Sequence, residues 1–394
     1  MWDLLAVQCI IFNIVSGVEL LEISMEKFLS LQMLRAAAST LVVLGHTRGL
    51  IGHHFDSTPF PSLFERGDRG VDLFFVLSGF IMTHVHFGDI GKPERYSGYL
   101  YSRVTRIYPF VWIVSIGAVV IYLAGFDPSK SGKLEFWPLV DSVMLLPQSG
   151  DALVGVTWTL KYEIFFYALF GILILSRQIG LVVLIGWQAA ILFLALARVP
   201  TESLWAYYLR EIALEFGVGC LAALLVMRQA RSPNGSAPVW STLALLMGCA
   251  SFLAMMQAEA SAPEIVAGAP RFLTYGLSAG LIIVGCCLLE RRGVLPTPKA
   301  LIFLGDASFA IYLVHYAAIS LALAAVARLH VQHFGAAASS ALAAFGVAAG
   351  LGFYILVERP ISRQFGARRR RLRRYPDAAM LGSVELRKQN QLAV

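Results

Sequence analysis

The chain has 394 residues, of which 57% are hydrophobic and only 14% are charged, and its formal net charge is +7. A soluble domain carries about 25% charged residues, so this composition excludes a water-soluble fold. The positive charge lies in the connections between apolar segments and in the C-terminal tail. That distribution is typical of contact with the anionic inner face of a membrane and argues against nucleic acid as a partner.

The first 24 residues form a short apolar segment that is interrupted by Asn13, Glu19 and Glu22. It lacks the basic region and small-residue cleavage site of a signal peptide. It is also a poor match to the ~20 apolar residues of a membrane span. We therefore treat residues 1–27 as an N-terminal extension. Either translation begins at Met25 or the extension is an interfacial amphipathic helix.

Ten apolar segments follow, each long enough to cross a bilayer as a helix. They cover 28–47, 71–88, 107–125, 157–176, 179–197, 205–227, 239–257, 271–290, 301–327 and 336–357. The connections richer in Lys and Arg are 89–106, 228–238, 291–300 and the tail, which the positive-inside rule assigns to the cytoplasm. The sequence predicts an all-α polytopic membrane protein with about ten transmembrane helices and both termini cytoplasmic. The membrane domain covers 28–358, and a basic cytoplasmic tail covers 359–394.

The first apolar segment contains Arg35 and His46, eleven residues apart. At ~3.6 residues per turn this is about three turns, so both side chains share one helix face and lie roughly 16 Å apart along the axis. An arginine facing lipid costs at least ~2.5 kcal/mol. We expect this face to look into protein or water, and histidine is well suited to proton transfer near neutral pH. The alternative for His46 is an ordinary interface residue.

Two carboxylates stand at the expected outer ends of later segments. Asp72 begins an apolar run, where it either belongs to a solvated loop or orients a neighbouring arginine or histidine. Glu163 enters the segment WTLKYEIFFY, which also carries Trp158 and Tyr167. A carboxylate in an apolar span is functional by default. Glu163 could orient the histidine, pair with an arginine, bind a sugar hydroxyl or join two helices by a salt bridge.

Arg103 and Arg106 in SRVTRIYP are three residues apart at the cytoplasmic entrance to the third segment. On a helix this spacing makes them neighbours, and two adjacent guanidinium groups repel unless an anion joins them. Phosphate is the natural match because arginine donates paired hydrogen bonds to it. The alternative is ordinary positive-inside anchoring.

The segment GDASFAIYLVHY places Ser308, Tyr312 and His315 on one helix face, which indicates either a polar cavity or hydrogen bonding between packed helices. Glu358, Arg359 and Pro360 end the last segment, and we interpret them as a helix stop. The five cysteines all lie in apolar runs without metal-ligand spacing, so we expect no metal site.

Six of these stretches together resemble the acyltransferase 3 family of integral membrane acyltransferases. They are LRAAASTLVVLGH, GVDLFFVLSGFIM, SRVTRIYP, WTLKYEIFFY, SFAIYLVHY and VERP. They occur in the family's order over about residues 29–360, and GVDLFFVLSGFIM looks most like the exopolysaccharide acetyltransferase branch. The resemblance implies a multi-pass protein of the inner (plasma) membrane. It also implies an acyl-CoA donor, usually acetyl-CoA, on the cytoplasmic side.

In this resemblance the reaction is O-acylation of a cell-surface or lipid-linked carbohydrate. Carried onto this chain, Arg35 and His46 form the family's arginine–histidine pair. Arg103 and Arg106 form the donor-binding pair. Trp158, Glu163 and Tyr167, with Ser308, Tyr312 and His315, complete the expected site.

We hypothesise that Arg103 and Arg106 hold the phosphates of acetyl-CoA and that His46 is the general base on a sugar hydroxyl. Glu163 or Asp72 would orient the imidazole, and Arg35 would support the thioester or its oxyanion. Direct transfer and an acyl-histidine intermediate both fit, as do acetyl and succinyl donors. Two other functions fit the same residues: a glycolipid transporter or flippase, and a scaffold in a complex with polysaccharide synthesis machinery.

Overall fold

The computed structural model describes residues 27–55, 60–124, 134–148, 152–201, 203–229, 238–263, 270–328 and 335–374. The predictions for the first 26 residues, including the start at Met25, and for the end of the tail lie outside the described residues. Every regular element in the described part is helical, in agreement with the predicted all-α class.

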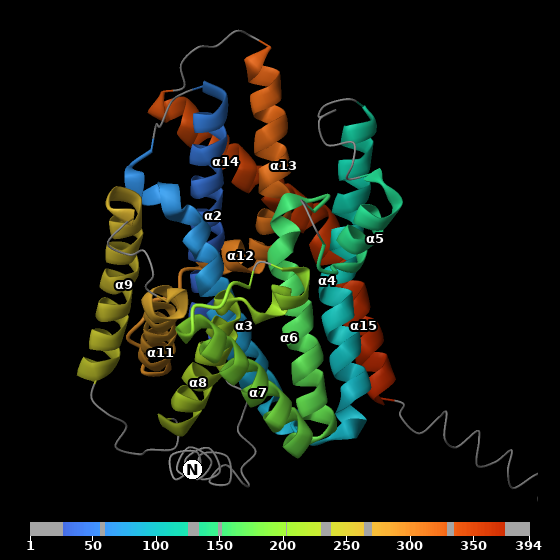
Figure 1. Cartoon of the computed structure of the whole chain (residues 1–394), viewed down its shortest axis with the longest axis vertical. Helices are drawn as coiled ribbons and strands as arrows, with labels where there is room; N and C mark the ends of the chain where they lie inside the picture. The colour runs from blue at the N-terminus through green and yellow to red at the C-terminus, as the bar shows by residue number, and fades with distance from the viewer. Residues whose placement is uncertain are drawn as a thin grey trace, which may run out of the picture.

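The longer elements are α2 (Ser30–Phe55), α3 (Gly70–His86), α4 (Tyr96–Leu123), α5 (Phe136–Met144), α6 (Trp158–Leu175), α7 (Arg177–Leu196), α8 (Leu214–Gln229), α9 (Pro238–Ser261), α11 (Leu277–Arg291), α12 (Lys299–Asp306), α13 (Ser308–Ala327), α14 (Ala336–Phe353) and α15 (Arg359–Arg374). Short turns include the 3-10 segments η1 (Ser62–Arg69), η6 (Leu204–Leu209) and η7 (Glu211–Ala213), and the π-helices η8 (Phe272–Gly276) and η9 (Tyr354–Glu358). Helices α2 and α3 lie centrally, with α9 at one edge and α4, α5 and α15 at the other (Figure 1).

Within the described residues, eight helical stretches are long and apolar enough to cross a membrane. Helices α2 and α8 are not among them, but both pack against these spans. Helix α8 has only 16 residues, and α2 carries Arg35, His46 and Arg48. The chain is therefore a multi-pass membrane protein. The count of ten spans and the cytoplasmic position of both termini stay predictions.

Several helix boundaries differ from those expected, and three of these differences bear on the site. Helix α4 starts at Tyr96, so Arg103 and Arg106 lie well inside a helix instead of at its entrance. The segment 301–327 is divided at Ala307 into α12 and α13. The helix stop expected at Glu358–Pro360 is wrong, because the chain continues through the π-helix η9 into α15. A π-turn already shifts the hydrogen-bond register, so the missing N–H of Pro360 is tolerated there.

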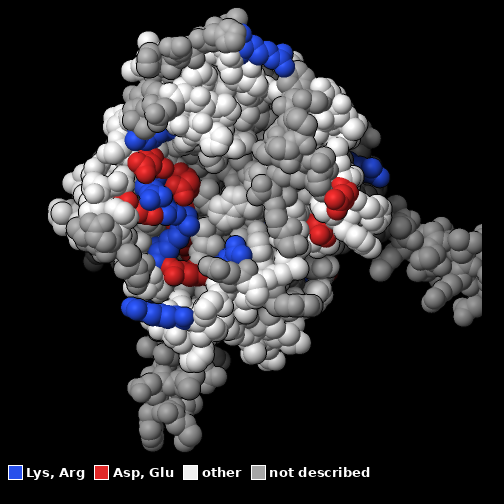
Figure 2. Space-filling model, turned by 45° about the horizontal axis from the view of Figure 1, so that its top comes forward, with Lys and Arg blue, Asp and Glu red and all other residues white. Residues whose placement is uncertain are grey.

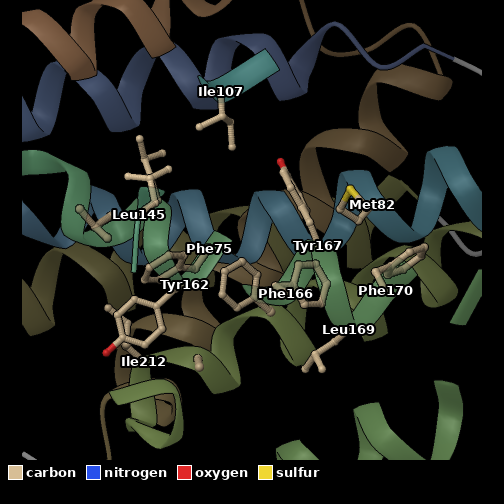
Figure 3. Packing of buried hydrophobic residues seen from close by; sticks show 14 of the residues in the cluster. Phe75, Met82, Ile107, Leu145, Tyr162, Phe166, Tyr167, Leu169, Phe170 and Ile212 are labelled. Atoms are coloured by element: carbon tan, nitrogen blue, oxygen red, sulfur yellow. The ribbon is translucent and has the colours of Figure 1, made fainter. Parts of the chain in front are cut away.

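The central packing joins α3, α6 and α8. Along α6, the rings of Tyr162, Phe166 and Phe170 follow one another on one side of the helix (Figure 3). Phe166 stacks on Phe216 of α8 with ring centroids 4.4 Å apart. Helix α8 approaches α3 so closely that a Cβ on Gly79 would lie 2.1 Å from the carbonyl oxygen of Phe216. The absence of a side chain at Gly79 is therefore what lets the two helices pack this closely.

Candidate active site

The face of α2 that carries Arg35 and His46 points into the protein. Ser39 and Val42, which lie between them, are 1% and 0% exposed. Val42 belongs to the same buried cluster as Phe75 and Tyr312. Because α2 is one continuous helix, the two polar residues stay about 16 Å apart along its axis. An arginine side chain cannot bridge that distance, so the expected contact of Arg35 with an oxyanion beside His46 does not fit this geometry.

His46 is hydrogen-bonded to a second histidine. Its Nδ1 lies 2.8 Å from Nε2 of His315 on α13, and the two rings are stacked with centroids 5.1 Å apart. His315 is fully buried. The predicted substrate-binding residue of α13 is thus the direct partner of His46.

The hydrogen bonds assign the tautomers of the two neutral rings. His315 Nδ1 lies 2.9 Å from the carbonyl oxygen of Ile311, which can only accept, so this nitrogen carries a proton. Nε2 of His315 is then an acceptor, and His46 donates to it from Nδ1. Nε2 of His46 is left with its lone pair, which is the form a general base needs.

Asp72 does not orient His46. Its carboxylate is fully buried and accepts two hydrogen bonds from Arg271, at 2.5 and 2.7 Å. Both oxygens are occupied by this guanidinium because a paired arginine–carboxylate contact satisfies a buried charge best. Of the two partners predicted for Asp72, the structure shows the arginine and not His46: Asp72 forms an ion pair between α3 and Arg271, just before η8.

Glu163 has other partners as well. It accepts a hydrogen bond from the hydroxyl of Tyr167, one turn along α6, and the Oγ of Ser78 lies 3.5 Å away. The nearby charge that acts on His46 is instead the carboxylate of Asp68 at the end of η1. Glu163 thus faces the arginine side of the site and acts electrostatically on Arg35 and Arg106, which fits the predicted alternative of an arginine partner and not that of the histidine.

Segment η1 is held against α2 by a glycine contact. A Cβ on Gly67 would lie 2.4 Å from the carbonyl oxygen of Leu41, and one on Gly45 would meet Gly67 at 2.8 Å. Only glycines permit this approach. It brings Asp68 to the outer end of the Arg35–His46 face, where its half-exposed carboxylate lies 3.4 Å from Arg69 and acts electrostatically on His46.

Arg35 and Arg106 lie between two hollow spaces. The first, the central cavity, measures about 60 Å³. Its polar lining consists of Arg35, Ser78, Arg106, Thr159, Glu163, Ser308 and Tyr312. The second, the inner pocket, measures about 280 Å³ and opens on the predicted cytoplasmic side. Its lining includes Arg35, Thr105, Arg106, Asp306, Glu358 and Phe365.

Glu358 gives the two arginines a shared counter-charge. It acts electrostatically on both Arg35 and Arg106 from the end of η9. Its Oε2 is buried and has no hydrogen-bond partner among the described residues. Helix α15, which follows, closes the inner pocket through Phe365. Two arginines, from α2 and α4, and one carboxylate, from η9, therefore meet where the central cavity and the inner pocket adjoin.

Arg103 lies apart from Arg106. Its guanidinium packs over the rings of Tyr167 and Tyr99 at 5.3 and 5.9 Å. It also lies 3.3 Å from Nε2 of His86. The inner pocket is lined by Arg106 and not by Arg103. The expected clamp of two adjacent arginines on one phosphate is not formed in this structure.

Of the remaining predicted residues, Ser308 and Tyr312 line the central cavity and Trp158 does not. Tyr312 donates to Val156 O and lies 2.8 Å from the hydroxyl of Thr159. Ser308 is 0% exposed, and its hydroxyl has no hydrogen-bond partner among the described residues. Trp158 lies on the other side of α6 and is 37% exposed. Ser308 and Tyr312 are thus in the cavity wall, whereas Trp158 faces a different space.

The helices and this buried arginine–histidine face define a multi-pass membrane protein with a polar site inside its helical bundle. The acyltransferase domain family matches residues 28–358, and the chain belongs to this family of acyltransferases. It is similar to the exopolysaccharide production protein ExoZ of Rhizobium meliloti (strain 1021). The two are 30% identical over 335 residues, which is 83% of this chain and 96% of ExoZ. No solved structure matches the chain.

Two residues of the site were not predicted as such. Glu358 was interpreted as part of a helix stop, although a carboxylate beside an apolar span is itself a signal. Asp68 lies among the charged residues just before Asp72 and was not singled out. In both cases the partner lies on a distant segment, so spacing along the chain carries no information about the contact.

Proposed function

We propose that this protein is an O-acetyltransferase of the inner membrane that moves an acetyl group from cytoplasmic acetyl-CoA to a hydroxyl of an exopolysaccharide or its lipid-linked precursor. The acyltransferase family and the similarity to an exopolysaccharide production protein support the reaction class. The hydrogen bond between His46 and His315 carries the proposal, because it leaves a basic nitrogen at the outer end of the site.

The donor enters from the inner pocket in this proposal. Its phosphates are attracted by Arg106 and Arg35, which line that pocket. The thioester arm passes these arginines into the central cavity, which holds several water molecules' volume but not a nucleotide. Arg35 therefore positions the donor and does not touch the reacting carbonyl.

Nε2 of His46 takes the proton of the acceptor hydroxyl as the oxygen attacks the thioester carbonyl. The tetrahedral intermediate collapses with cleavage of the carbon–sulfur bond, and the imidazolium returns its proton to the leaving thiolate of CoA. His315 holds the ring through Nδ1 during both transfers, and the carboxylate of Asp68 stabilises the transient positive charge.

The test is acetyl transfer by the full-length protein in membrane vesicles, with acetyl-CoA and host exopolysaccharide as substrates. His46→Ala should lower release of CoA and formation of acetylated polysaccharide by 10²-fold or more, as expected for loss of a general base. His53→Ala is the matched control, since His53 is exposed on the last turn of the same helix. Full activity of His46→Ala would refute the proposal. Movement of polysaccharide across the vesicle membrane without consumption of acetyl-CoA would also refute it, because a transporter predicts that result.

A further inference from the structure

A large hollow lies on the predicted outer side of the bundle, separate from the central cavity. We call it the vestibule; it measures about 950 Å³. It is enclosed by the end of η1, the start of α6, the end of α7, the end of α9 and the start of η8. Figure 2 shows the face turned toward the viewer, where basic and acidic side chains gather into one patch amid a largely uncharged surface.

The walls of the vestibule are fixed by ion pairs. Arg69 donates to both oxygens of Glu259, which also accepts a hydrogen bond from Tyr275 at 2.6 Å. Arg271 is paired with the buried carboxylate of Asp72, as described above. These arginines and carboxylates neutralise one another, so they shape the space without giving it a net charge.

Two further arginines line the same space. Arg210 packs over Tyr207 at 4.9 Å and donates from Nε to the carbonyl oxygen of Thr201 at 3.3 Å. Arg198 is exposed at the end of α7 with φ of 53°. This left-handed conformation favours glycine, so the position is unusual for an arginine. Glu211, the remaining carboxylate of the wall, accepts a hydrogen bond from the backbone N–H of Arg271, and burial raises its pKa.

Aromatic rings complete the lining. Trp158 and Tyr162 face the vestibule from the first turns of α6, and Trp158 is 37% exposed. A partly exposed indole offers a flat apolar surface with an N–H group at its edge. The C–H faces of a sugar ring fit such a surface, while its hydroxyls reach the surrounding arginines and carboxylates.

The vestibule borders the reaction path at two places. Phe75 lines the central cavity and contacts both Trp158 and Tyr162, with ring centroids 6.5 and 5.9 Å apart. One layer of rings therefore separates the two spaces. At the end of η1, Asp68 acts on His46 while the next residue, Arg69, lines the vestibule.

We infer that the vestibule binds the acceptor, and that the acceptor is an acidic saccharide whose carboxylate is bound by Arg198 and Arg210 while a sugar ring stacks on Trp158. The inference rests on the proposed acetyl transfer and names the class of its acceptor. Paired guanidinium–carboxylate hydrogen bonds supply the selectivity for an acidic over a neutral sugar.

The experiment measures equilibrium binding by calorimetry on the detergent-solubilised full chain. The probes are a gluco-oligosaccharide that ends in glucuronate, the same oligosaccharide ending in glucose, and inorganic pyrophosphate. The glucuronate probe should bind at least tenfold more tightly than the glucose probe. Arg198→Gln and Arg210→Gln should each weaken it by about tenfold, the loss expected for one charge-assisted hydrogen bond. Both should change binding of the glucose probe less than twofold.

Arg95→Gln is the matched control, since Arg95 is exposed on the opposite side of the bundle, and it should bind all probes like the unchanged protein. Any of three results would overturn the inference. The first is equal affinity for the two oligosaccharides, and the second is no binding of either. The third is unchanged binding of the glucuronate probe in both Arg198→Gln and Arg210→Gln. Pyrophosphate binding through Arg198 without preference between the oligosaccharides would also overturn it, and would assign the arginines to the diphosphate of a lipid carrier.

Release of CoA from acetyl-CoA, measured on the same preparation, keeps the two proposals distinguishable. A protein that binds the glucuronate probe through Arg198 but never consumes acetyl-CoA refutes acetyl transfer alone. A protein that transfers acetyl groups but binds both oligosaccharides equally refutes the acidic acceptor alone.

Discussion

Replacement of His315 by leucine should separate the orientation of the catalytic base from its presence. His315 is fully buried and accepts the Nδ1 proton of His46 at 2.8 Å, a contact between helices α13 and α2. Leucine fills much of the space but leaves that proton without an acceptor. The bond from Nδ1 becomes charge-assisted when His46 is protonated in the transition state, and such a bond contributes about 1.5–3 kcal/mol. Its loss corresponds to a fall in kcat of roughly 10- to 150-fold at 1.36 kcal/mol per decade.

The assay is steady-state acetyl transfer at varied acetyl-CoA, with thermal unfolding followed in parallel. We expect kcat to fall in His315→Leu while KM for acetyl-CoA stays within twofold, because in the proposed function the donor binds at Arg35 and Arg106, on the other side of the site. His315→Gln should recover part of kcat, since its amide oxygen offers an acceptor at similar reach. The double variant with His46→Ala should be no slower than His46→Ala alone, because the two rings act as one unit. An undiminished kcat in His315→Leu would refute this role of His315. So would a further fall of the same size when His315→Leu is added to His46→Ala.

Three further predictions concern the framework. Gly79→Ala should prevent folding, because the added Cβ would lie 2.1 Å from a backbone oxygen of α8. Gly88→Ala is the control, since a Cβ there would have no atom within 4 Å. In size-exclusion chromatography only the control should behave like the unchanged chain. Asp72→Asn removes the carboxylate that is hydrogen-bonded to Arg271 and leaves this guanidinium only the weaker interactions with Glu215 and Asp68. The free energy of unfolding should fall by up to about 3–5 kcal/mol in denaturant titrations; an unchanged midpoint would contradict the ion pair. Glu358→Gln should lower the melting temperature, because Arg35 and Arg106 lose their shared counter-charge. Saturating acetyl-CoA should raise the melting temperature of this variant by more than that of the unchanged protein, because its anionic phosphates replace the missing charge. An equal shift in the two proteins would count against donor binding at Arg35 and Arg106.

The sequence predicted the helical class, the membrane location and the shared face of Arg35 and His46. These features depend on local quantities: apolar length, 3.6-residue periodicity and the cost of a charge in lipid. They need no knowledge of which helices are neighbours. The family motifs extend this local information, since their order along the chain indicates an acyltransferase before any contact is known.

The partners of the site residues could not be predicted in the same way. The contact between His46 and His315 joins residues 269 positions apart, and that between Asp72 and Arg271 joins residues 199 apart. Each buried carboxylate had several arginines and histidines within its plausible reach, and only helix packing decides among them. Glu358 shows a second limit, because a proline two residues later suggested a helix end, whereas a π-turn absorbs the proline and turns the carboxylate toward Arg35 and Arg106.

The separation of Arg103 from Arg106 has a local cause that spacing alone did not reveal. Three residues on a helix make side chains neighbours at their Cβ atoms, but Arg103 packs over the rings of Tyr99 and Tyr167. Cation–π contacts of this kind hold a guanidinium without an anion. Arg106 alone therefore lines the inner pocket with Arg35.

Transfer across the bundle is tested most directly by supplying acetyl-CoA to one face of the membrane and the acceptor to the other. Radiolabelled acetyl-CoA, which does not cross membranes, is added to sealed vesicles that expose either the cytoplasmic or the outer face, with the acceptor polysaccharide on the opposite side. The account predicts labelled polysaccharide when acetyl-CoA meets the cytoplasmic face, and almost none in the reverse orientation or with His46→Ala. Equal labelling from both faces, or undiminished labelling with His46→Ala, would contradict it.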